Sequence, residues 1–459
     1  MLFIVLFIVL FSVFLPSPAL IFSGACRLPF FSLSSVSPGS SVQPRRYLLM
    51  DQKRFQECRS QLMDRIEVTR DLSDAEIYAI IDELIEESDP RRRMRLSDRW
   101  EMRRELFNSV RRLDVLQDFI DDDSVTEIMV NGLQSIFIER SGRLFRCPEH
   151  FSSQEKLQDV IQRIVALSNR VANEAVPIVD ARLENGARVN IVMNPVAVDG
   201  PAITIRRFPD HPISMQQLIE WNSVSREAAD YLKKLVTAGY NIFISGGTGS
   251  GKTTFLNALS NFIPKDERII TVEDNAELQI QGVRNLVRLE ARRPNAEGGG
   301  EVTIRDLIRA SLRMRPSRII VGEVRGAETI DMLQSLNTGH DGSLSTGHGN
   351  SPQDMLSRLE TMVLMGLSIP IPAIRRQIAS GIDIMVHLSR MRDKSRKVLE
   401  ILEIDGYDIP SGEIRTHPLF EFEESGMDKD GRLTGRLRKV GCLSHTQKLH
   451  RAGIRAEDM

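Results

Sequence analysis

A glycine-rich loop between an apolar strand and a helix constrains the fold of this chain more than any other feature. The loop reads, in order, Gly246, Gly247, Thr248, Gly249, Ser250, Gly251, Lys252, Thr253 and Thr254. Residues 241–245 before it predict a buried strand, and residues 255–259 after it predict a helix closed by Pro264. In this order of elements, backbone N–H groups turn inward around phosphate oxygens, and the helix N-terminus adds positive potential. The stretch therefore predicts a phosphate-binding loop rather than a turn that binds nothing.

Two side chains of this loop suggest which phosphate compound it holds. Lys252 is placed to reach the β- and γ-phosphates of a nucleoside triphosphate, and the Thr253 hydroxyl is placed to hold Mg²⁺. We therefore expect ATP and Mg²⁺ to bind here.

Carboxylates follow two other apolar stretches that predict strands. Residues 318–322 end in Glu323, which we predict to be the general base or a ligand of Mg²⁺ through water. Residues 269–272 end in Glu273 and Asp274. Glu273 is a candidate to share the activation of water, whereas Asp274 is equally suited to cap the next turn.

A glycine-rich segment over residues 339–350 carries two of the eight histidines of the chain, His340 and His348. No third ligand stands at metal spacing, so the pattern argues against zinc. We interpret the pair as a sensor of the γ-phosphate; the alternative is a glycine-rich surface loop.

Arginines gather in the segment before the phosphate loop. The candidates are Arg182, Arg188, Arg206 and Arg207. A guanidinium on the developing γ-phosphate charge assists phosphoryl transfer, although each arginine alone is more often part of a surface ion pair. As a group beside a hinge they suggest that a preceding domain closes over ATP.

The composition and the hydrophobic pattern change several times along the chain and divide it into segments. These are 1–49, an apolar and then Ser/Pro-rich leader; 50–112, a charged helical region; 113–208, an α/β N-terminal domain; 209–225, a proline-containing linker; 226–406, a strand–helix domain around the loop; and 407–459, a C-terminal hairpin and tail. We predict an α/β protein in which a RecA-like P-loop ATPase domain follows a smaller α/β domain and an N-terminal helical region.

Local signals support three of these elements. Ser73 and Glu76 form a capping box before an apolar helix face. Ser152 with Glu155 predicts the start of an amphipathic helix, and Asn185-Gly186 predicts a hairpin.

The leader does not match the rest of the chain. Residues 1–15 are almost wholly apolar, but they are too short for a spanning helix and lack the basic head of a secretory signal. Charged, helix-forming sequence begins at Met50. We interpret residues 1–49 as lying upstream of the true start; the alternative is a genuine membrane anchor.

Composition disfavours some classes of function. The net charge is −2 and only five tyrosines are present, so no basic, aromatic surface for nucleic acid is expected. A nucleic-acid motor is therefore a remote alternative. The cysteines, Cys26, Cys58, Cys147 and Cys442, lie far apart and suit a reducing cytosol.

Through these motifs the chain resembles the type II/IV secretion traffic ATPases, and within them the CpaF-type ATPase of tight-adherence (Flp) pilus assembly. The stretches that carry the resemblance are 125–132, 318–325, 332–346, 357–362 and 379–383. The likeness runs from about Asp114 to near Gly453.

The resemblance implies a role for each motif. The loop 246–254 corresponds to the Walker A motif, and Glu323 to the catalytic glutamate of an atypical Walker B strand. The further correspondences are Glu273 and Asp274 with the Asp box, His340 and His348 with the His box, and Arg188 and Arg206 with arginines that reach the γ-phosphate. In this chain Gly347 and Gly349 flank His348 where the family usually has larger residues, which predicts a looser loop.

The resemblance also implies an assembly. It implies a homohexamer at the cytoplasmic face of the inner membrane that hydrolyses ATP and pushes on inner-membrane platform proteins of a pilus or secretion machine. A type IV secretion traffic ATPase with the same chemistry is the alternative. A non-catalytic scaffold is disfavoured because Lys252, Thr253 and Glu323 are all present.

Overall fold

A computed structural model describes residues 52–66, 72–91, 93–140, 142–168, 170–207, 212–294 and 299–459. The leader at 1–49, with its alternative as a membrane anchor, lies outside these residues. Residues 58–459 form one compact unit, to which all of the described chain except residues 52–57 belongs. Among the described residues, none of the helices combines the length and the apolar character that crossing a membrane requires.

Charged helices open the described chain. They are α1 (Gln52–Arg65), α2 (Asp74–Ser88) and α3 (Leu96–Arg111). The predicted capping box is confirmed, because the Ser73 hydroxyl accepts from the Glu76 N–H and the Glu76 carboxylate accepts from the Ser73 N–H. The apolar face of α2 is buried through Ile77, Ile81, Leu84 and Ile85.

The smaller domain is built on an antiparallel sheet of six strands in the order β3-β2-β1-β6-β5-β4. Its strands are β1 (Val125–Asn131), β2 (Ser135–Arg140), β3 (Arg143–Cys147), β4 (Ile178–Arg182), β5 (Arg188–Val192) and β6 (Ala202–Arg206). The short helices η2 (Asp114–Leu116) and α4 (Gln117–Ile120) precede the sheet. These elements enclose one apolar core of their own.

Of the two local predictions in this domain, the helix start is off by one residue and the hairpin is confirmed. Helix α5 (Gln154–Leu167) is capped by Ser153, whose hydroxyl accepts from the Lys156 N–H; Ser152, the predicted start, lies one residue too early. The hairpin at Asn185-Gly186 is confirmed between β4 and β5.

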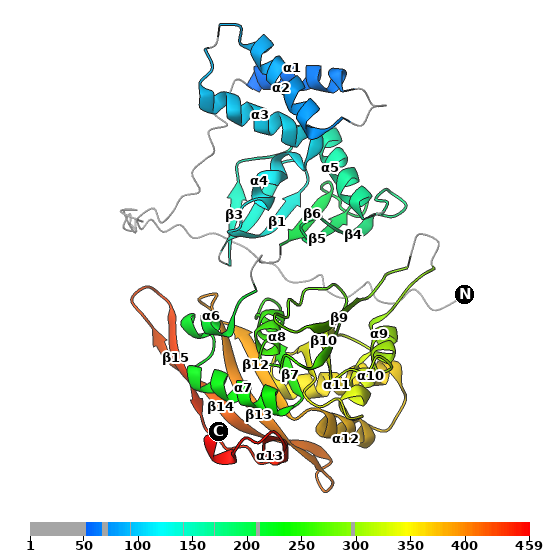
Figure 1. The fold of residues 1–459 in the computed structure, drawn as a ribbon, viewed down its shortest axis with the longest axis vertical. Coiled ribbons are helices and arrows are strands. Elements are labelled where there is room, and N and C mark those ends of the chain that lie inside the picture. Colours follow the sequence, from blue (N-terminus) through cyan, green and yellow to red (C-terminus); the bar gives the residue numbers. More distant parts are fainter. Residues whose placement is uncertain are drawn as a thin grey trace, which may run out of the picture. The chain divides into compact units, whose positions relative to one another are not determined.

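The larger domain is a nine-stranded sheet in the order β15-β14-β13-β12-β7-β11-β10-β8-β9 (Figure 1). The strands are β7 (Ile242–Gly246), β8 (Arg268–Glu273), β9 (Asn285–Glu290), β10 (Arg318–Val324), β11 (Leu344–His348), β12 (Ile384–Arg390), β13 (Arg396–Asp408), β14 (Glu413–Met427) and β15 (Leu433–Lys439). The six neighbouring strands β12, β7, β11, β10, β8 and β9 run parallel to one another. Strands β13, β14 and β15 extend the sheet beyond β12 as antiparallel strands.

Helices cover both faces of this sheet. They are α6 (Met215–Glu220), α7 (Arg226–Ala238), α8 (Lys252–Ser260), α9 (Ile304–Ser311), α10 (Thr329–Leu336), α11 (Pro352–Gly366), α12 (Ile371–Gly381) and α13 (Gln447–Arg451), with a last turn η3 (Ala456–Asp458). Ile242 and Ile244 pack with α7 and α8, whereas Phe243 between them packs on the opposite face with α9 to α12. Strand β7 is therefore apolar on both faces, as expected for a central strand of a parallel sheet that helices cover on both sides. The predicted RecA-like α/β fold is present.

Two predicted boundaries need correction. Residue 407, the proposed start of the C-terminal hairpin and tail, falls inside β13, and β14 and β15 continue the same sheet. Within the proposed linker at 209–225, helix α6 already contributes Met215 and Leu218 to the core of the larger domain. The apolar face of α6 and the pairing of β13 with β14 decide these boundaries.

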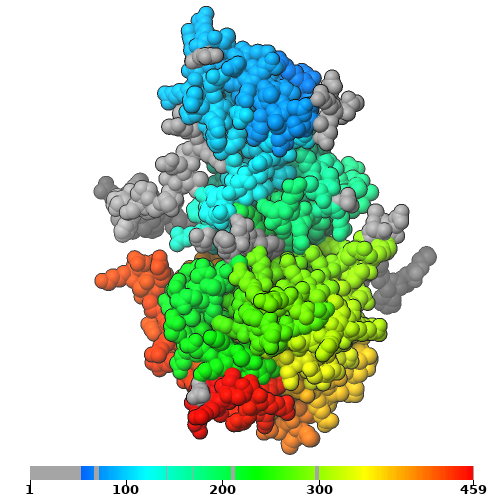
Figure 2. Space-filling view, viewed as in Figure 1, coloured from blue at the N-terminus to red at the C-terminus, as the bar shows by residue number. Residues whose placement is uncertain are grey.

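The end of the chain is fixed to the larger domain. Helix α13 contacts α7, and Figure 2 shows the red C-terminal residues on the surface beside green residues of this domain. Lys448 of α13 pairs with Asp341 and with Asp383, at the starts of β11 and β12. Tyr240 donates its hydroxyl proton to the His445 carbonyl at 2.6 Å.

Candidate functional site

The glycine-rich loop connects β7 to α8 as predicted, and its conformation requires glycine at particular positions. A Cβ at Gly246 would lie 2.4 Å from the Leu388 carbonyl oxygen and 2.6 Å from the Ser250 hydroxyl. Gly251, which precedes the first residue of α8, has a φ of 92°, in the left-handed region. The Ser250 hydroxyl is buried and has no hydrogen-bond partner among the residues that the structure describes. The loop is a tight cradle at a helix N-terminus, with a polar atom in need of a partner.

Lys252 lies inside this cradle. Its ammonium donates to the Gly247 carbonyl at 3.0 Å and contacts His348 Nδ1 at 3.2 Å. Burial lowers the pKa of Lys252, and the charge of Glu323 opposes that shift. The ammonium is therefore held beside the loop by neutral acceptors, which triphosphate oxygens can displace.

His348 links the loop to the carboxylate of the neighbouring strand. An ammonium group can only donate, so Nδ1 of His348 accepts and Nε2 carries the proton. Nε2 lies 2.8 Å from Glu323 Oε1 in a close polar contact that is not an aligned hydrogen bond, since this oxygen has no hydrogen-bond partner among the described residues. Burial lowers the pKa of His348, and the cationic side chains of Lys252, Arg325 and Arg358 reinforce that direction against Glu323. The imidazole is therefore neutral near pH 7.

Glu323, at the end of β10, is held from its other side by Arg325. Arg325 Nη2 donates to Glu323 Oε2 at 2.8 Å, and Arg325 Nη1 lies 3.6 Å from Asp274 Oδ2. Asp274 thus takes part in an ion pair, and it accepts no hydrogen bond that caps a turn from any residue the structure describes. A continuous chain of contacts runs from Lys252 through His348 and Glu323 to Arg325.

Glu273 ends β8, the strand beside β10, and it occupies a different environment. Its Oε2 accepts the N–H groups of Glu277 and Leu278 at 2.8 and 2.9 Å, while Oε1 is buried and finds no hydrogen-bond partner in the described part of the chain. Burial raises the pKa of Glu273 to about 7, although the two N–H groups act against that shift. A carboxyl that titrates near neutral pH is suited to proton transfer at that pH.

The residues present fit Mg²⁺ with ATP. Thr253 lies in the first turn of α8 and is only partly buried. Glu323 and Glu273 supply carboxylate oxygens from neighbouring strand ends, and hydroxyl and carboxylate oxygens are the ligands that Mg²⁺ prefers.

His340 does not join this cluster. It precedes β11, whereas His348 ends it, so about 13 Å of strand separates the two histidines at ~3.3 Å per residue. His340 Nδ1 instead lies 3.2 Å from the Ser335 carbonyl oxygen at the end of α10. His340 therefore lies apart from His348 in this structure, and its part in sensing the γ-phosphate stays a prediction.

The two arginines predicted to reach the phosphate are already paired. Arg188 Nη1 lies 2.7 Å from Glu277 Oε1, and Arg206 Nε lies 3.1 Å from Glu127 Oε1. The neighbouring candidates Arg182 and Arg207 pair with Glu290 and Asp123. Within the described part of the chain, none of the four makes a hydrogen bond or an ion pair with the loop, so their role at the phosphate stays a prediction.

One residue near the loop was missed from the sequence. His387 of β12 is buried, and its Nδ1 lies 2.8 Å from the Ser245 hydroxyl, one residue before Gly246. Burial lowers its pKa despite a hydrogen bond with the Asn350 backbone. His387 therefore ties the strand before the loop to the segment after His348. The available signal was a single polar residue within the apolar run 384–388.

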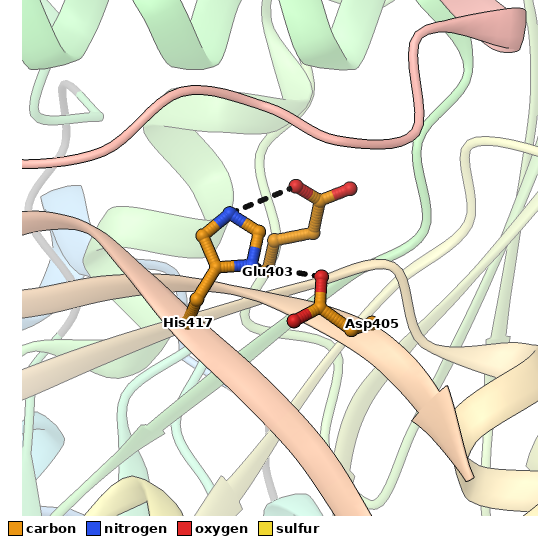
Figure 3. Close-up of side chains that lie close together, drawn as sticks. All are labelled: Glu403, Asp405 and His417. Atoms are coloured by element: carbon orange, nitrogen blue, oxygen red, sulfur yellow. Dashed lines mark hydrogen bonds and ion pairs between the residues drawn. The ribbon is translucent and has the colours of Figure 1, made fainter. Parts of the chain in front are cut away.

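A second cluster of titratable side chains lies away from the loop. Glu403, Asp405 and His417 approach closely enough to hold a metal ion, from β13 and β14 (Figure 3). However, His417 Nδ1 lies 2.8 Å from Asp405 Oδ1, and Nε2 lies 3.0 Å from the Cys442 carbonyl. Both partners are acceptors, so both ring nitrogens donate and no lone pair is left for a metal.

The cluster instead fastens the C-terminal segment. Glu403 is almost fully buried, and its carboxylate accepts the N–H groups of Ser444 and His445 at 2.7 and 2.8 Å. Burial alone lowers the pKa of His417, but hydrogen bonds to Asp405 and to the Cys442 carbonyl, with the charge of Glu403, raise it above its ordinary value.

We expect this cluster to make stability depend on pH. Because the pKa of His417 is raised on folding, its contribution is full below pH 6.5 and is lost as pH rises through the folded pKa. His417→Gln should lower the free energy of unfolding by about 1–3 kcal/mol at pH 6 and by less at pH 8.5. Urea denaturation at pH 6 and pH 8.5 measures this loss, with His450→Gln, an exposed histidine of α13, as the matched control. An equal loss at both pH values contradicts the assignment.

Comparisons with known proteins place the chain in a family. Residues 111–456 match the profile of the family described as Type II/IV secretion system protein. A Mycobacterium tuberculosis protein assigned provisionally to conjugal transfer is 36% identical over 293 residues, covering 62% of this chain and 83% of that protein. The type IV secretion system protein PtlH of Bordetella pertussis is 31% identical over 326 residues, covering 65% and 96%.

A solved structure is also similar. The VirB11 ATPase of the Brucella suis type IV secretion system, in complex with sulphate, shares 29% identity, with a TM-score of 0.35 and coverage of 62% of this chain and 94% of that one. The family profile spans most of the chain and includes the loop, the strand-end carboxylates and His348. The protein therefore belongs to the type II/IV secretion system protein family.

Proposed function

We propose that this protein is a motor ATPase that hydrolyses ATP to ADP and phosphate to drive a pilus or secretion machine. The observation that carries the proposal is the contact chain from Lys252 through His348 to Glu323. It joins the residue that would hold the phosphates to the carboxylate that would direct water. A turn without a ligand has no need for a lysine, a histidine and a glutamate in mutual contact.

The contacts suggest what happens when a triphosphate enters the loop. Phosphate oxygens are stronger acceptors for the Lys252 ammonium than a neutral imidazole, so Lys252 would leave His348. His348, no longer accepting from that cation, would turn its protonated Nε2 toward the γ-phosphate, whose oxygens can accept that hydrogen. Glu323 and Glu273, on neighbouring strand ends, would orient and deprotonate the attacking water.

Metal would complete this site. Mg²⁺, when bound, neutralises charge on the β- and γ-phosphates. Thr253 would hold it directly, and Glu323 through water.

The finer proposal is that the motor serves tight-adherence (Flp) pilus assembly, from the cytoplasmic face of the inner membrane and against platform proteins there. Its support is the resemblance of stretches such as 125–132 and 332–346 to CpaF-type ATPases. Relatives named for conjugal transfer and type IV secretion support the alternative, a type IV secretion traffic ATPase. Loss of surface pili with intact secretion in a Lys252→Ala strain would favour the pilus, and the reverse phenotype would favour secretion.

We further propose that the working form is a homohexamer. Its support is the family resemblance. Gel filtration with light scattering, with and without an ATP analogue, tests this; a monomer under both conditions contradicts it.

The basic experiment is an ATPase assay on the purified chain, which should release ADP and phosphate in a magnesium-dependent way. Adding single-stranded DNA separates the remote alternative, a nucleic-acid motor. An unchanged rate agrees with the proposal, whereas strong stimulation favours the alternative.

The raised pKa of Glu273 leads to a prediction about pH. Below its pKa of about 7 the carboxyl is protonated and cannot accept a proton, so the rate should rise as pH increases through 7. In Glu273→Gln we expect kcat to fall about 10²-fold and this rise to disappear from the remaining activity. Rates of phosphate release between pH 5.5 and 8.5 measure it. The same rise in the variant would show that another group titrates.

A further inference from the structure

An open cavity of about 770 Å³ lies beside the phosphate loop, inside the larger domain. Gly247 and Thr248 of the loop form one side of it, and His348 with Arg325 forms another. Gly349 and Asn350 continue the wall after His348, and helix α11 completes it through Asp354, Ser357, Arg358, Thr361, Met362 and Met365. Because His348 contacts Lys252, this cavity adjoins the part of the loop where the β- and γ-phosphates would lie.

The glycines that flank His348 bring α11 to this position. A Cβ at Gly347 would lie 2.9 Å from Met355 Cε, and a Cβ at Gly349 would lie 3.0 Å from Met355 Cβ. Met355 of α11 is fully buried against these two glycines. The predicted looser loop is therefore not what the structure has, since the space freed by the missing side chains is filled by the helix.

Helix α11, which packs against these glycines, carries Arg358, an arginine that pairs with no carboxylate among the described residues. Arg358 is exposed in the cavity wall, and among the described residues it makes neither a hydrogen bond nor an ion pair. Its neighbour Arg325 is committed to Glu323 and Asp274, and Arg188 and Arg206 are committed to Glu277 and Glu127. Arg358 is near enough to His348 for its charge to act on the imidazole.

We infer that Arg358 is a phosphate-binding residue of this site, which contacts the γ-phosphate of ATP and the phosphate released from it. The inference rests on the proposed function and adds a residue to it. A guanidinium presents paired donors that match two phosphate oxygens, and a triphosphate would be the first anion to satisfy them. The arginine comes from the same domain as the loop and requires no movement of the preceding domain.

The test compares two nucleotides that differ at the γ-phosphate. Calorimetry on the full chain with Mg²⁺ gives the Kd of the non-hydrolysable analogue AMP-PNP and of ADP for the parent, Arg358→Ala and Arg358→Lys. We expect Arg358→Ala to weaken AMP-PNP binding about 10- to 100-fold, as loss of a charge-assisted hydrogen bond predicts, and ADP binding less than twofold. Arg358→Lys should restore part of the AMP-PNP affinity. Arg313→Ala, an exposed arginine outside the cavity lining, removes the same charge and should change neither Kd.

The outcomes are separable. Unchanged AMP-PNP affinity in Arg358→Ala, or equal losses for AMP-PNP and ADP, overturns the inference while the proposed function stands. A parent chain that binds neither nucleotide overturns the proposed function and the inference with it. Arg358 makes no hydrogen bond or ion pair to the described residues, so its truncation should leave the thermal unfolding midpoint unchanged, and this is checked in parallel.

Discussion

Lys252→Ala is expected to reduce ATP hydrolysis by about 10²- to 10³-fold. The ammonium is already positioned within the loop by the Gly247 carbonyl, so its loss removes a charge aimed at the phosphates without rearranging the cradle. The effect should appear in both KM and kcat, because the lysine contacts the phosphates in the ground state and in the transition state. Steady-state phosphate release from purified protein measures it.

Lys429→Ala serves as the control for this variant. Lys429 is exposed in the turn between β14 and β15, so its removal tests a loss of charge at a distance from the loop. We expect parental rates from it. If Lys252→Ala hydrolysed ATP as fast as the parent, the assignment of the loop as the nucleotide site would be wrong.

Glu323→Gln is expected to lower kcat by about 10³-fold while ATP binding is retained. Glutamine keeps the shape of the side chain but cannot accept the proton of the attacking water. Arg325 keeps Asp274 as a partner, so the ion pair around the site is weakened rather than lost. A fall in kcat at nearly constant nucleotide affinity identifies a role in the chemical step. Single-turnover hydrolysis together with calorimetry separates the two quantities.

Glu174→Gln is the matched control, because Glu174 is an exposed carboxylate of the smaller domain. This variant should keep the kcat and the ATP affinity of the parent. A retained kcat in Glu323→Gln would move the general base to Glu273, whose carboxyl titrates near pH 7. Loss of ATP binding in Glu323→Gln would instead indicate that this carboxylate mainly holds metal.

The architecture around the loop could be predicted because local and long-range signals agree there. The spacing of Gly246, Gly251 and Lys252 requires a strand before it and a helix after it, and the structure has β7 and α8 in those places. Glu323 was identifiable because an apolar strand ends there, and parallel strands end at the same edge of the sheet.

The failures have a common physical cause, which is that sequence spacing does not give distance across a fold. His340 and His348 are near in sequence, but His340 precedes β11 and contacts the Ser335 carbonyl, whereas His348 ends this strand beside the loop. Residues near 407 looked like the start of an appended hairpin, although β13 continues through them. A polar composition cannot show that a strand edge is already paired.

Arg358 and His387 show what the sequence concealed. Arg358 is one of many arginines on amphipathic helices, and only the packing of Met355 against Gly347 and Gly349 brings it to the loop. His387 lies on a strand whose neighbour in space, β7, precedes it by more than a hundred residues. The role of each residue depends on which side chains lie next to it, and only the folded structure shows this.

The central claim is that triphosphate is held by Lys252 and cleaved beside Glu323. Its most direct test is the identity of the nucleotide that stays bound to Glu323→Gln after incubation with α-labelled ATP and rapid gel filtration. The account predicts uncleaved ATP on this variant, ADP on the parent, and no retained nucleotide on the double variant Lys252→Ala/Glu323→Gln. Retention of ATP by the double variant, or conversion to ADP by Glu323→Gln at the parental rate, would contradict it.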